Sequence, residues 1–201
     1  MSPHSVQRNL DVVSLGEPLI EFNQTQPHPP TYLQGFGGDT SNAIIAAARA
    51  GARTAYLTLL GEDRWAEALI RLWHHDGVSV TGVRQLPGQR TGIYFVHHDE
   101  NGHHFSYARA GSAASRMTPE DLMGAWSNQI AQSHWLHVSG ISMAISESAR
   151  ATVLEAMRMA RNAGTLVALD TNLRLSLWPL EQARSCLAQA MAQCDLLLPS
   201  L

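Results

Sequence analysis

The feature that most limits the possible folds is an alternation of short apolar runs with stretches of helical periodicity. Runs rich in Val, Ile, Leu and Ala are separated by segments with apolar residues at helical spacing. This alternation is typical of a parallel sheet with helices on its faces. We therefore predict an α/β fold with strands over 11–16, 54–61, 134–140, 165–170 and 195–199.

Capping residues indicate where several helices begin. Asp63 precedes a helical pattern that ends at Gly77, and Ser146 precedes another that ends at Gly164. Thr118 followed by Pro119 also predicts a helix start, and Pro179 opens a further helix, because proline is well tolerated in the first helical turn.

The segment 91–111, TGIYFVHHDENGHHFSYARAG, departs from this alternation. Two extended runs are joined at Asn101-Gly102, which is a strong signal for a β-hairpin. Antiparallel strands do not belong in a parallel core. We predict a small sheet that projects from the main domain and covers a binding cleft.

The segment 35–51, GFGGDTSNAIIAAARAG, places two adjacent glycines before an alanine-rich helix. One interpretation is structural, because Asp39, Thr40 and Ser41 are all good N-cap residues. The other is functional: glycines allow the backbone to approach a ligand, which then meets the free amides of the helix start. The pattern by itself leaves both open.

The composition excludes several classes of function. Hydrophobic residues make up 45% of the 201 residues and charged residues 15%, with a net charge of −3, so the chain is globular and lacks the basic surface of a nucleic-acid-binding protein. No segment is predicted to span a membrane or to act as a signal peptide. Two cysteines, Cys186 and Cys194, do not make a disulfide framework, and we expect a cytoplasmic protein.

Two groups of polar residues are candidates for a site. Asp170, Asn172 and Arg174 follow a predicted strand, and ligands of α/β sheets bind beyond the carboxyl ends of strands. Tyr107 and Arg109 lie two residues apart on the hairpin and so share one face of it, as Tyr94 is expected to do. The first group can also be explained as a capped loop with a surface arginine, and the second as ordinary cross-strand packing with an exposed charge. His97, His98, His103 and His104 surround the hairpin turn, but neighbouring residues of a strand point to opposite faces, so no metal site is predicted.

Together these motifs resemble the ribokinase-like (PfkB) family of sugar kinases, and most closely its 2-keto-3-deoxygluconate branch. GEPLIEF (16–22) resembles the family's first strand, and GGDTSNAIIAAARAGARTAYLTLLGED (37–63) resembles its N-terminal signature. TGIYFV and FSYARAGSAAS are similar to the strands of its lid, near 17–36 and 91–110, and DTNLRLSLW (170–178) is similar to a stretch of the acid-sugar branch. The resemblance implies a parallel sheet flanked by helices with a small β-sheet lid.

The resemblance also implies roles for individual residues. Gly38 and Asn42 would contact the sugar, while Tyr94, Tyr107 and Arg109 would contact it from the lid. Arg174 would lie near the sugar carboxylate and the transferred phosphoryl group, and Asn172 near the phosphates of ATP, which implies ATP and Mg²⁺ as cofactors. Pairing of two copies through the lid is a further expectation.

The family's second signature, D-T-x-G-A-G-D, does not occur in the sequence. In the family this segment supplies the general base and amides for the phosphates, so no catalytic base is predicted within residues 1–201. The strand at 195–199 is expected to be a sheet edge, or else the chain is the N-terminal part of a longer kinase domain whose C-terminal part is missing. We expect the full-length form to phosphorylate 2-keto-3-deoxygluconate and this chain to be inactive. The alternatives are a kinase for another sugar, such as fructose or ribose, and a non-catalytic sugar-binding remnant.

Overall fold

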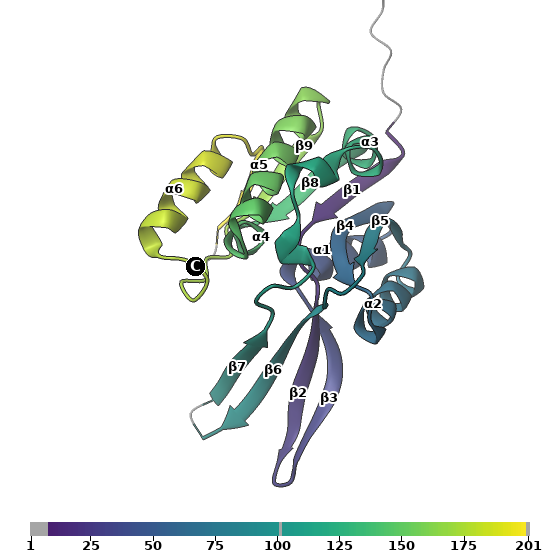
Figure 1. Ribbon diagram of the computed structural model, residues 1–201. Helices are drawn as coiled ribbons and strands as arrows, with labels where there is room; N and C mark the ends of the chain where they lie inside the picture. Colours follow the sequence, from purple (N-terminus) through teal and green to yellow (C-terminus); the bar gives the residue numbers. More distant parts are fainter. Residues whose placement is uncertain (1–7, 101, 200–201) are drawn as a thin grey trace, which may run out of the picture.

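The main domain is built on a six-stranded parallel sheet with the strand order β10-β9-β8-β1-β4-β5 (Figure 1). The structure is a computed structural model that describes residues 8–100 and 102–199. The predicted α/β class is confirmed, and each predicted strand is present. The strands are β1 (Leu10–Leu15), β4 (Thr54–Gly61), β5 (Val78–Leu86), β8 (Ser133–Ser139), β9 (Leu166–Asp170) and β10 (Leu196–Leu198).

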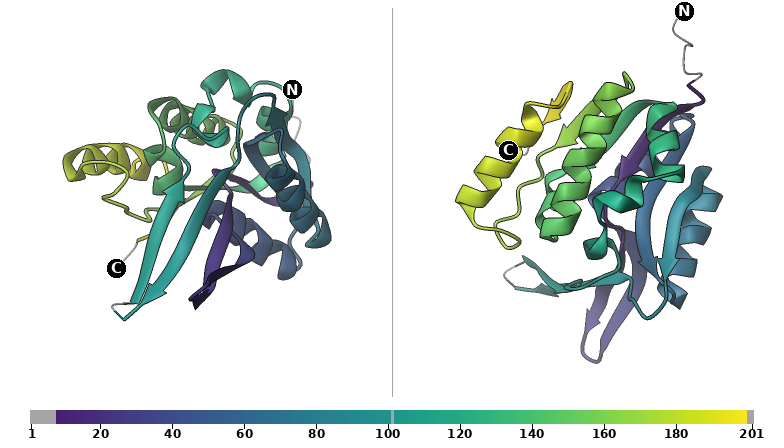
Figure 2. Two further views of the ribbon diagram at one scale, coloured as in Figure 1. Left: turned by 60° about the horizontal axis from the view of Figure 1, so that its bottom comes forward. Right: turned by 45° about the horizontal axis from the view of Figure 1, so that its top comes forward.

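Helices cover both faces of this sheet (Figure 2). They are α1 (Asp39–Arg49), α2 (Arg64–His75), α3 (Ala125–Ala131), α4 (Gly140–Ala144), α5 (Glu147–Asn162) and α6 (Leu180–Met191), with short 3₁₀ turns at Ala114–Arg116 and Pro119–Leu122. Strand β4 is buried along its whole length, which is why it reads as a continuous apolar run. Its alternate side chains enter two cores: Leu57 packs with α3 and α5, and Tyr56 packs with α1 and α2.

The segment after β1 and the 91–111 hairpin form a separate four-stranded sheet, ordered β3-β2-β6-β7. Its strands are β2 (Leu19–Pro27), β3 (Pro30–Gly37), β6 (Gly92–Asp99) and β7 (Gly102–Ala108). The sheet projects from the main domain (Figure 1). The predicted antiparallel pairing of the hairpin is confirmed, with Tyr94 opposite Tyr107. Asn101 of the predicted turn lies outside the described residues.

The segment 16–22, likened to the family's first strand, follows β1, which ends at Leu15, and residues from Leu19 onward enter the small sheet, as expected for lid strands near 17–36. Two local expectations need correction. Thr118 and Pro119 begin only a single 3₁₀ turn, although Thr118 does form a capping box with Asp121. The N-cap of α1 is Gly38, which makes no side-chain cap.

Buried contacts explain why the expected N-cap residues of α1 do not cap it. The Thr40 hydroxyl lies 2.9 Å from the Tyr56 hydroxyl, and the indole nitrogen of Trp73 donates to the Ser41 hydroxyl at 3.0 Å. Both hydroxyls are buried inside the first turn and satisfy core aromatic residues. Packing against the core therefore outweighs their capping preference.

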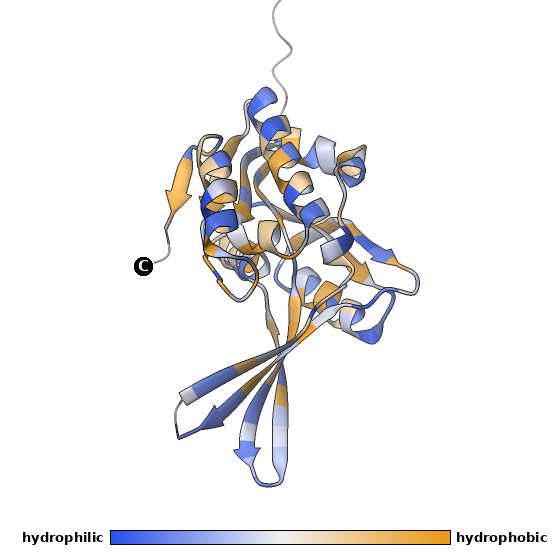
Figure 3. Ribbon diagram, turned by 60° about the vertical axis from the view of Figure 1, so that its left-hand side comes forward, coloured by the Kyte–Doolittle hydropathy of each residue, from blue (hydrophilic) through white to orange (hydrophobic). Residues whose placement is uncertain are grey.

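The edge strand β10 is apolar and exposed (Figure 3). Among the described residues β10 pairs only with β9, so it lies at the edge of the sheet, as both alternatives for residues 195–199 expected. No helix among the described residues is long and apolar enough to cross a lipid bilayer.

Replacing Gly38 by alanine should destabilise the fold more than the same change at another left-handed glycine. A Cβ on Gly38, whose φ is +99°, would lie 2.6 Å from the carbonyl oxygen of Glu17 and 2.9 Å from the Cα of Pro18. We expect Gly38→Ala to lower the free energy of unfolding by about 2–3 kcal/mol, measured by urea denaturation.

Gly77→Ala is the matched control, because Gly77 has a φ of +77° but nothing within 4 Å of the added Cβ. It should lose only about 1 kcal/mol, from backbone strain. Equal losses for the two variants would show that the close packing at Gly38 is unimportant.

Candidate functional site

All seven residues predicted to bind sugar or nucleotide line one cleft. The cleft has a volume of about 760 Å³ and lies between the carboxyl ends of the parallel strands and the small sheet. The main domain contributes Gly38, Asn42, Asn172 and Arg174, and the small sheet and its exit contribute Tyr94, Tyr107 and Arg109. A second groove, of about 650 Å³ between α5 and α6, contains none of these residues.

Several residues of the cleft were not predicted from the sequence. They are Glu17, Leu19, Asp39, His103, His104, Phe105, Ile141 and Ser176. The position of Glu17 directly after β1 was an available signal, since polar residues at that end of a parallel strand face the ligand side of the sheet. His103, His104 and Phe105 line the cleft because the hairpin lies over the main domain. Sequence periodicity does not reveal where the hairpin is placed.

The paired glycines bring the start of α1 close to the protein's own chain. Besides the contact of Gly38 with the backbone of Glu17, a Cβ on Gly37 would lie 2.6 Å from the hydroxyl oxygen of Tyr94. Of the two interpretations of this segment, the capping one is wrong for Asp39, Thr40 and Ser41. The glycines instead permit a close approach that places the first turn of α1 at the cleft.

Asn172 joins the loop after β9 to the start of α1. Its side-chain amide donates to an Asp39 carboxylate oxygen at 3.0 Å, and its backbone N–H donates to Asp170 at 3.0 Å. Its φ of 31° lies in the left-handed region that asparagine tolerates. Asn172 therefore holds two elements of the main domain in fixed relation across the floor of the cleft.

Burial controls the protonation of the groups beneath this contact. It raises the pKa of Asp170, an effect that Asp39 adds to and the Asn172 backbone N–H opposes. It also lowers the pKa of His137, against the attraction of Asp39 and Asp170. His137 is therefore the neutral imidazole near neutral pH.

The two tyrosines form an aromatic wall on the small sheet. Their rings are stacked with centroids 5.8 Å apart and an interplanar angle of 25°. The Tyr94 hydroxyl donates a hydrogen bond to Glu21, and burial together with this hydrogen bond raises the pKa of Tyr94 well above its ordinary value. Tyr94 therefore stays protonated, while Tyr107 is half exposed and lines the cleft.

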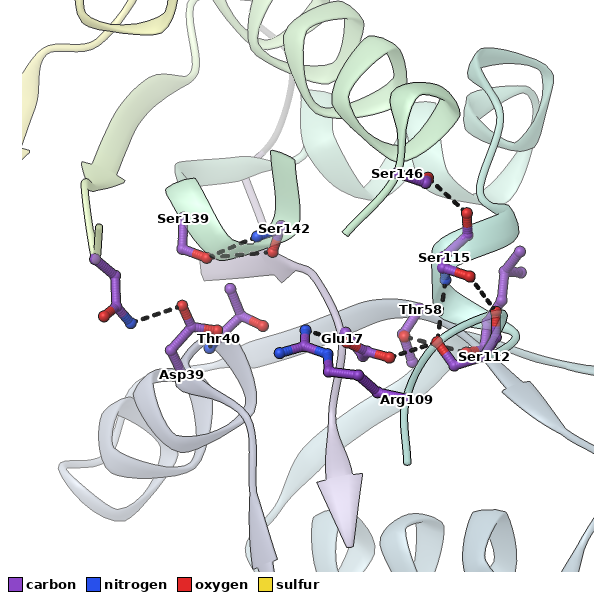
Figure 4. Close-up of polar contacts among 12 residues, drawn as sticks. Glu17, Asp39, Thr40, Thr58, Arg109, Ser112, Ser115, Ser139, Ser142 and Ser146 are labelled. Atoms are coloured by element: carbon purple, nitrogen blue, oxygen red, sulfur yellow. Dashed lines mark hydrogen bonds and ion pairs between the residues drawn. The ribbon is translucent and has the colours of Figure 1, made fainter. Parts of the chain in front are cut away.

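Arg109 has an internal partner that the sequence did not reveal. One guanidinium nitrogen donates to the Glu17 carboxylate, and the Ser112 hydroxyl donates to the other oxygen of that carboxylate (Figure 4). Burial raises the pKa of Glu17, and the Arg109 charge and the two donors favour its ionised form. Arg109 thus lines the cleft as one half of an ion pair.

Arg174 differs from Arg109 in both exposure and partners. It is exposed, and its guanidinium donates to the carbonyl oxygen of the adjacent Leu173 at 3.1 Å. It makes no ion pair with a described acidic residue, although its charge partly opposes the rise in the pKa of nearby Asp170. Its guanidinium can therefore bind an anionic ligand.

The hairpin histidines pair with each other and with acidic or polar residues. The Nδ1 atoms of His98 and His103 lie 2.7 Å apart, and His104 Nε2 lies 2.9 Å from an Asp99 oxygen. Within residues 8–100 and 102–199, no group of three His, Cys, Asp or Glu side chains is arranged to hold a metal ion.

Comparisons with known proteins place these observations in a family context. The sequence profile of the pfkB family of carbohydrate kinases matches residues 9–201. The chain is 37% identical over 177 residues to the 2-dehydro-3-deoxygluconokinase of Thermoproteus tenax, a match covering 85% of this chain and 52% of that protein. It is 33% identical over 193 residues to fructokinase-2 of Solanum habrochaites, covering 92% and 58%.

Among solved structures, the fructokinase of Xylella fastidiosa with bound ATP superposes with a TM-score of 0.85 at 27% identity. The match covers 93% of this chain and 56% of that one. The chain therefore spans between 52% and 58% of the length of these three relatives.

The Asn172 bridge can be tested by two substitutions. Asn172→Gly removes the bond to Asp39 but keeps a residue that tolerates a positive φ, whereas Asn172→Ala removes the bond and adds backbone strain. We expect Asn172→Ala to lower the free energy of unfolding by about 1–2 kcal/mol more than Asn172→Gly, measured by urea denaturation. A larger loss for the glycine variant would contradict the left-handed conformation of this loop.

Proposed function

We propose that the chain, which belongs to the pfkB family of carbohydrate kinases, forms the sugar-binding part of a kinase for 2-keto-3-deoxygluconate. The observation that carries this proposal is the convergence of the seven predicted residues on one cleft. Residues separated by more than a hundred positions meet there, from both the main domain and the small sheet. The 37% identity to a 2-dehydro-3-deoxygluconokinase supports the choice of sugar.

The chemistry of the lining suits an acid sugar. Asn42 offers both a donor and an acceptor to sugar hydroxyls, and Gly38 lines the cleft at the helix start. Tyr94 and Tyr107 close the opposite wall, so the small sheet acts as a lid. Arg174 provides a planar guanidinium that matches the geometry of a carboxylate, and Arg109 offers N–H donors to the sugar from the side of the small sheet.

The nucleotide is assigned to the side of the cleft formed by Asn172 and Arg174. Arg174 is exposed and without an acidic partner among the described residues, so its guanidinium fits the phosphates of ATP. Bound ATP supplies the transferred phosphoryl group, and the accompanying Mg²⁺ binds largely through phosphate oxygens. This chain contributes charge and orientation, since D-T-x-G-A-G-D is not in its sequence.

A neutral sugar is the second candidate substrate. Fructokinase-2 of Solanum habrochaites, at 33% identity, is nearly as similar as the acid-sugar kinase. A neutral sugar needs no carboxylate partner, so the two candidates differ in their dependence on cationic side chains. A non-catalytic remnant that binds sugar shares the absence of turnover predicted below. A reading frame that encodes D-T-x-G-A-G-D downstream of codon 201 would distinguish a kinase from such a remnant.

A second copy of the chain is the proposed partner of the small sheet. Leu33 and Phe105 lie on one cross-strand row of this sheet, through Asn23 and Val96, and both side chains are more than half exposed. Exposed large apolar side chains on one face favour association. We expect homo-oligomers through this face.

Binding measurements on the 201-residue chain test the choice of sugar. By isothermal titration calorimetry, 2-keto-3-deoxygluconate should bind more tightly than fructose or ribose. Arg174→Gln should weaken binding of the acid sugar by about 10–100-fold, because a charge-assisted hydrogen bond contributes about 1.5–3 kcal/mol.

Arg71→Gln is the control for the loss of a positive charge, because Arg71 lies exposed on α2 outside the cleft. It should leave both sugars unaffected. Tighter binding of fructose than of the acid sugar by the unaltered chain would instead favour the fructokinase assignment.

Turnover is a separate prediction. The 201-residue chain should not phosphorylate 2-keto-3-deoxygluconate above background in a coupled ATP assay. Loss of a general base alone lowers rates by about 10²–10⁴-fold, and the phosphate-binding amides of the second signature are not in the sequence either. Robust ATP-dependent turnover by a protein verified to contain only residues 1–201 would show that these residues include all the groups needed for catalysis.

A further inference from the structure

We propose that Glu17 is a specificity-determining residue that acts through Arg109. Its buried carboxylate compensates the charge of Arg109, so that Arg174 alone provides the cationic charge that makes the cleft prefer an acid sugar. The inference rests on the proposed acid-sugar function and assigns unequal tasks to the two arginines of the cleft.

The first support is burial. The side chains of Glu17 and Arg109 are only 1% and 11% exposed. Charges removed from water interact strongly and are poorly screened by salt, and a charge left alone there is strongly destabilising. At this depth the guanidinium and the carboxylate act as a neutral unit.

The second support is that Glu17 has no room to turn away from Arg109. A Cβ on Gly92 would lie 2.9 Å from a Glu17 carboxylate oxygen, so the backbone of β6 packs directly against it. The Ser112 hydroxyl donates to the same carboxylate oxygen, and the Ser112 carbonyl accepts from the Ser115 hydroxyl at 2.7 Å. The Ser115 carbonyl in turn accepts at 2.6 Å from Ser146, the N-cap of α5 (Figure 4). This chain of hydrogen bonds fixes the carboxylate.

The third support is the contrast with the other charged groups of the cleft. Asp39, the second carboxylate of the lining, accepts from the side chain of Asn172 and from the backbone N–H of Thr40 at 2.8 Å. Arg174 has no such acidic partner among the described residues. Arg109 retains further N–H groups for a ligand, so it contributes directed hydrogen bonds without net charge.

The decisive experiment removes the pair as a unit. In the 201-residue chain, Glu17→Gln combined with Arg109→Met replaces a neutral pair by neutral side chains, a change that buried pairs often tolerate. The readout is the ratio of the dissociation constants for fructose and 2-keto-3-deoxygluconate. We expect this ratio to stay within about threefold of the unaltered chain, while Arg174→Gln lowers it at least about tenfold. An equal fall in the double variant would overturn the proposal, because Arg109 would then carry the preference.

The single variant Glu17→Gln leaves the Arg109 charge uncompensated. The ratio should then rise at least about tenfold, since a second uncompensated cation faces the ligand carboxylate. Ser112→Ala is the control: it removes one hydrogen bond from Glu17 but keeps its charge, so the ratio should not change. An unchanged ratio in Glu17→Gln would contradict the assigned role.

A denaturation cycle tests the pair without any sugar. Glu17→Gln and Arg109→Met alone should each lower the urea midpoint, and their combination should recover most of the loss. Additive losses would show that the two charges are not coupled and would reject the proposal. If the unaltered chain binds both sugars equally, the proposed substrate is wrong, and a coupled cycle would still support the compensation of Arg109 by Glu17.

Discussion

The fold depends on close packing at the junction where the chain passes between its two sheets. The backbone of Glu17 meets Gly38 there, and the side chain of Glu17 meets Gly92, Arg109 and Ser112. These contacts bind the segments that enter and leave the small sheet to one buried carboxylate. The position of the small sheet over the cleft, and so the distance between its tyrosines and the main domain, follows from this junction.

The junction explains why several polar groups are buried in an otherwise apolar protein. On the opposite side of it, Asp63 caps α2 and also accepts from the backbone N–H and hydroxyl of Thr91, just before β6 begins. Buried polar groups are tolerated when every partner is in place, and they then allow only one arrangement of the elements that they join. The small sheet is thus anchored at both of its inner strands, β2 and β6, by side-chain contacts as well as by its backbone.

The cleft divides its tasks between a rigid floor and an aromatic wall. Asn172 and Asp39 connect the loop after β9 to α1, and the neutral His137 interacts electrostatically with Asp39 and Asp170. Tyr94 and Tyr107 stack on the facing sheet. An open, exposed cation at Arg174 beside a compensated one at Arg109 creates an uneven charge distribution within a single cleft. Such a distribution orients a ligand that carries its negative charge at one end.

The sequence by itself determined the α/β class, the parallel core and the hairpin, because those follow from local periodicity and from capping residues such as Asp63 and Ser146. The family resemblance of its motifs also identified seven of the residues that line the cleft, but not Glu17 or the hairpin residues His103, His104 and Phe105. Tertiary structure alone decided the N-cap of α1, where core aromatic residues take the hydroxyls of Thr40 and Ser41. It likewise decided the partner of Arg109, since an ion pair between residues 92 positions apart leaves no local pattern. Periodicity reports which face of an element is buried, whereas long-range contacts depend on how the completed elements are placed in space.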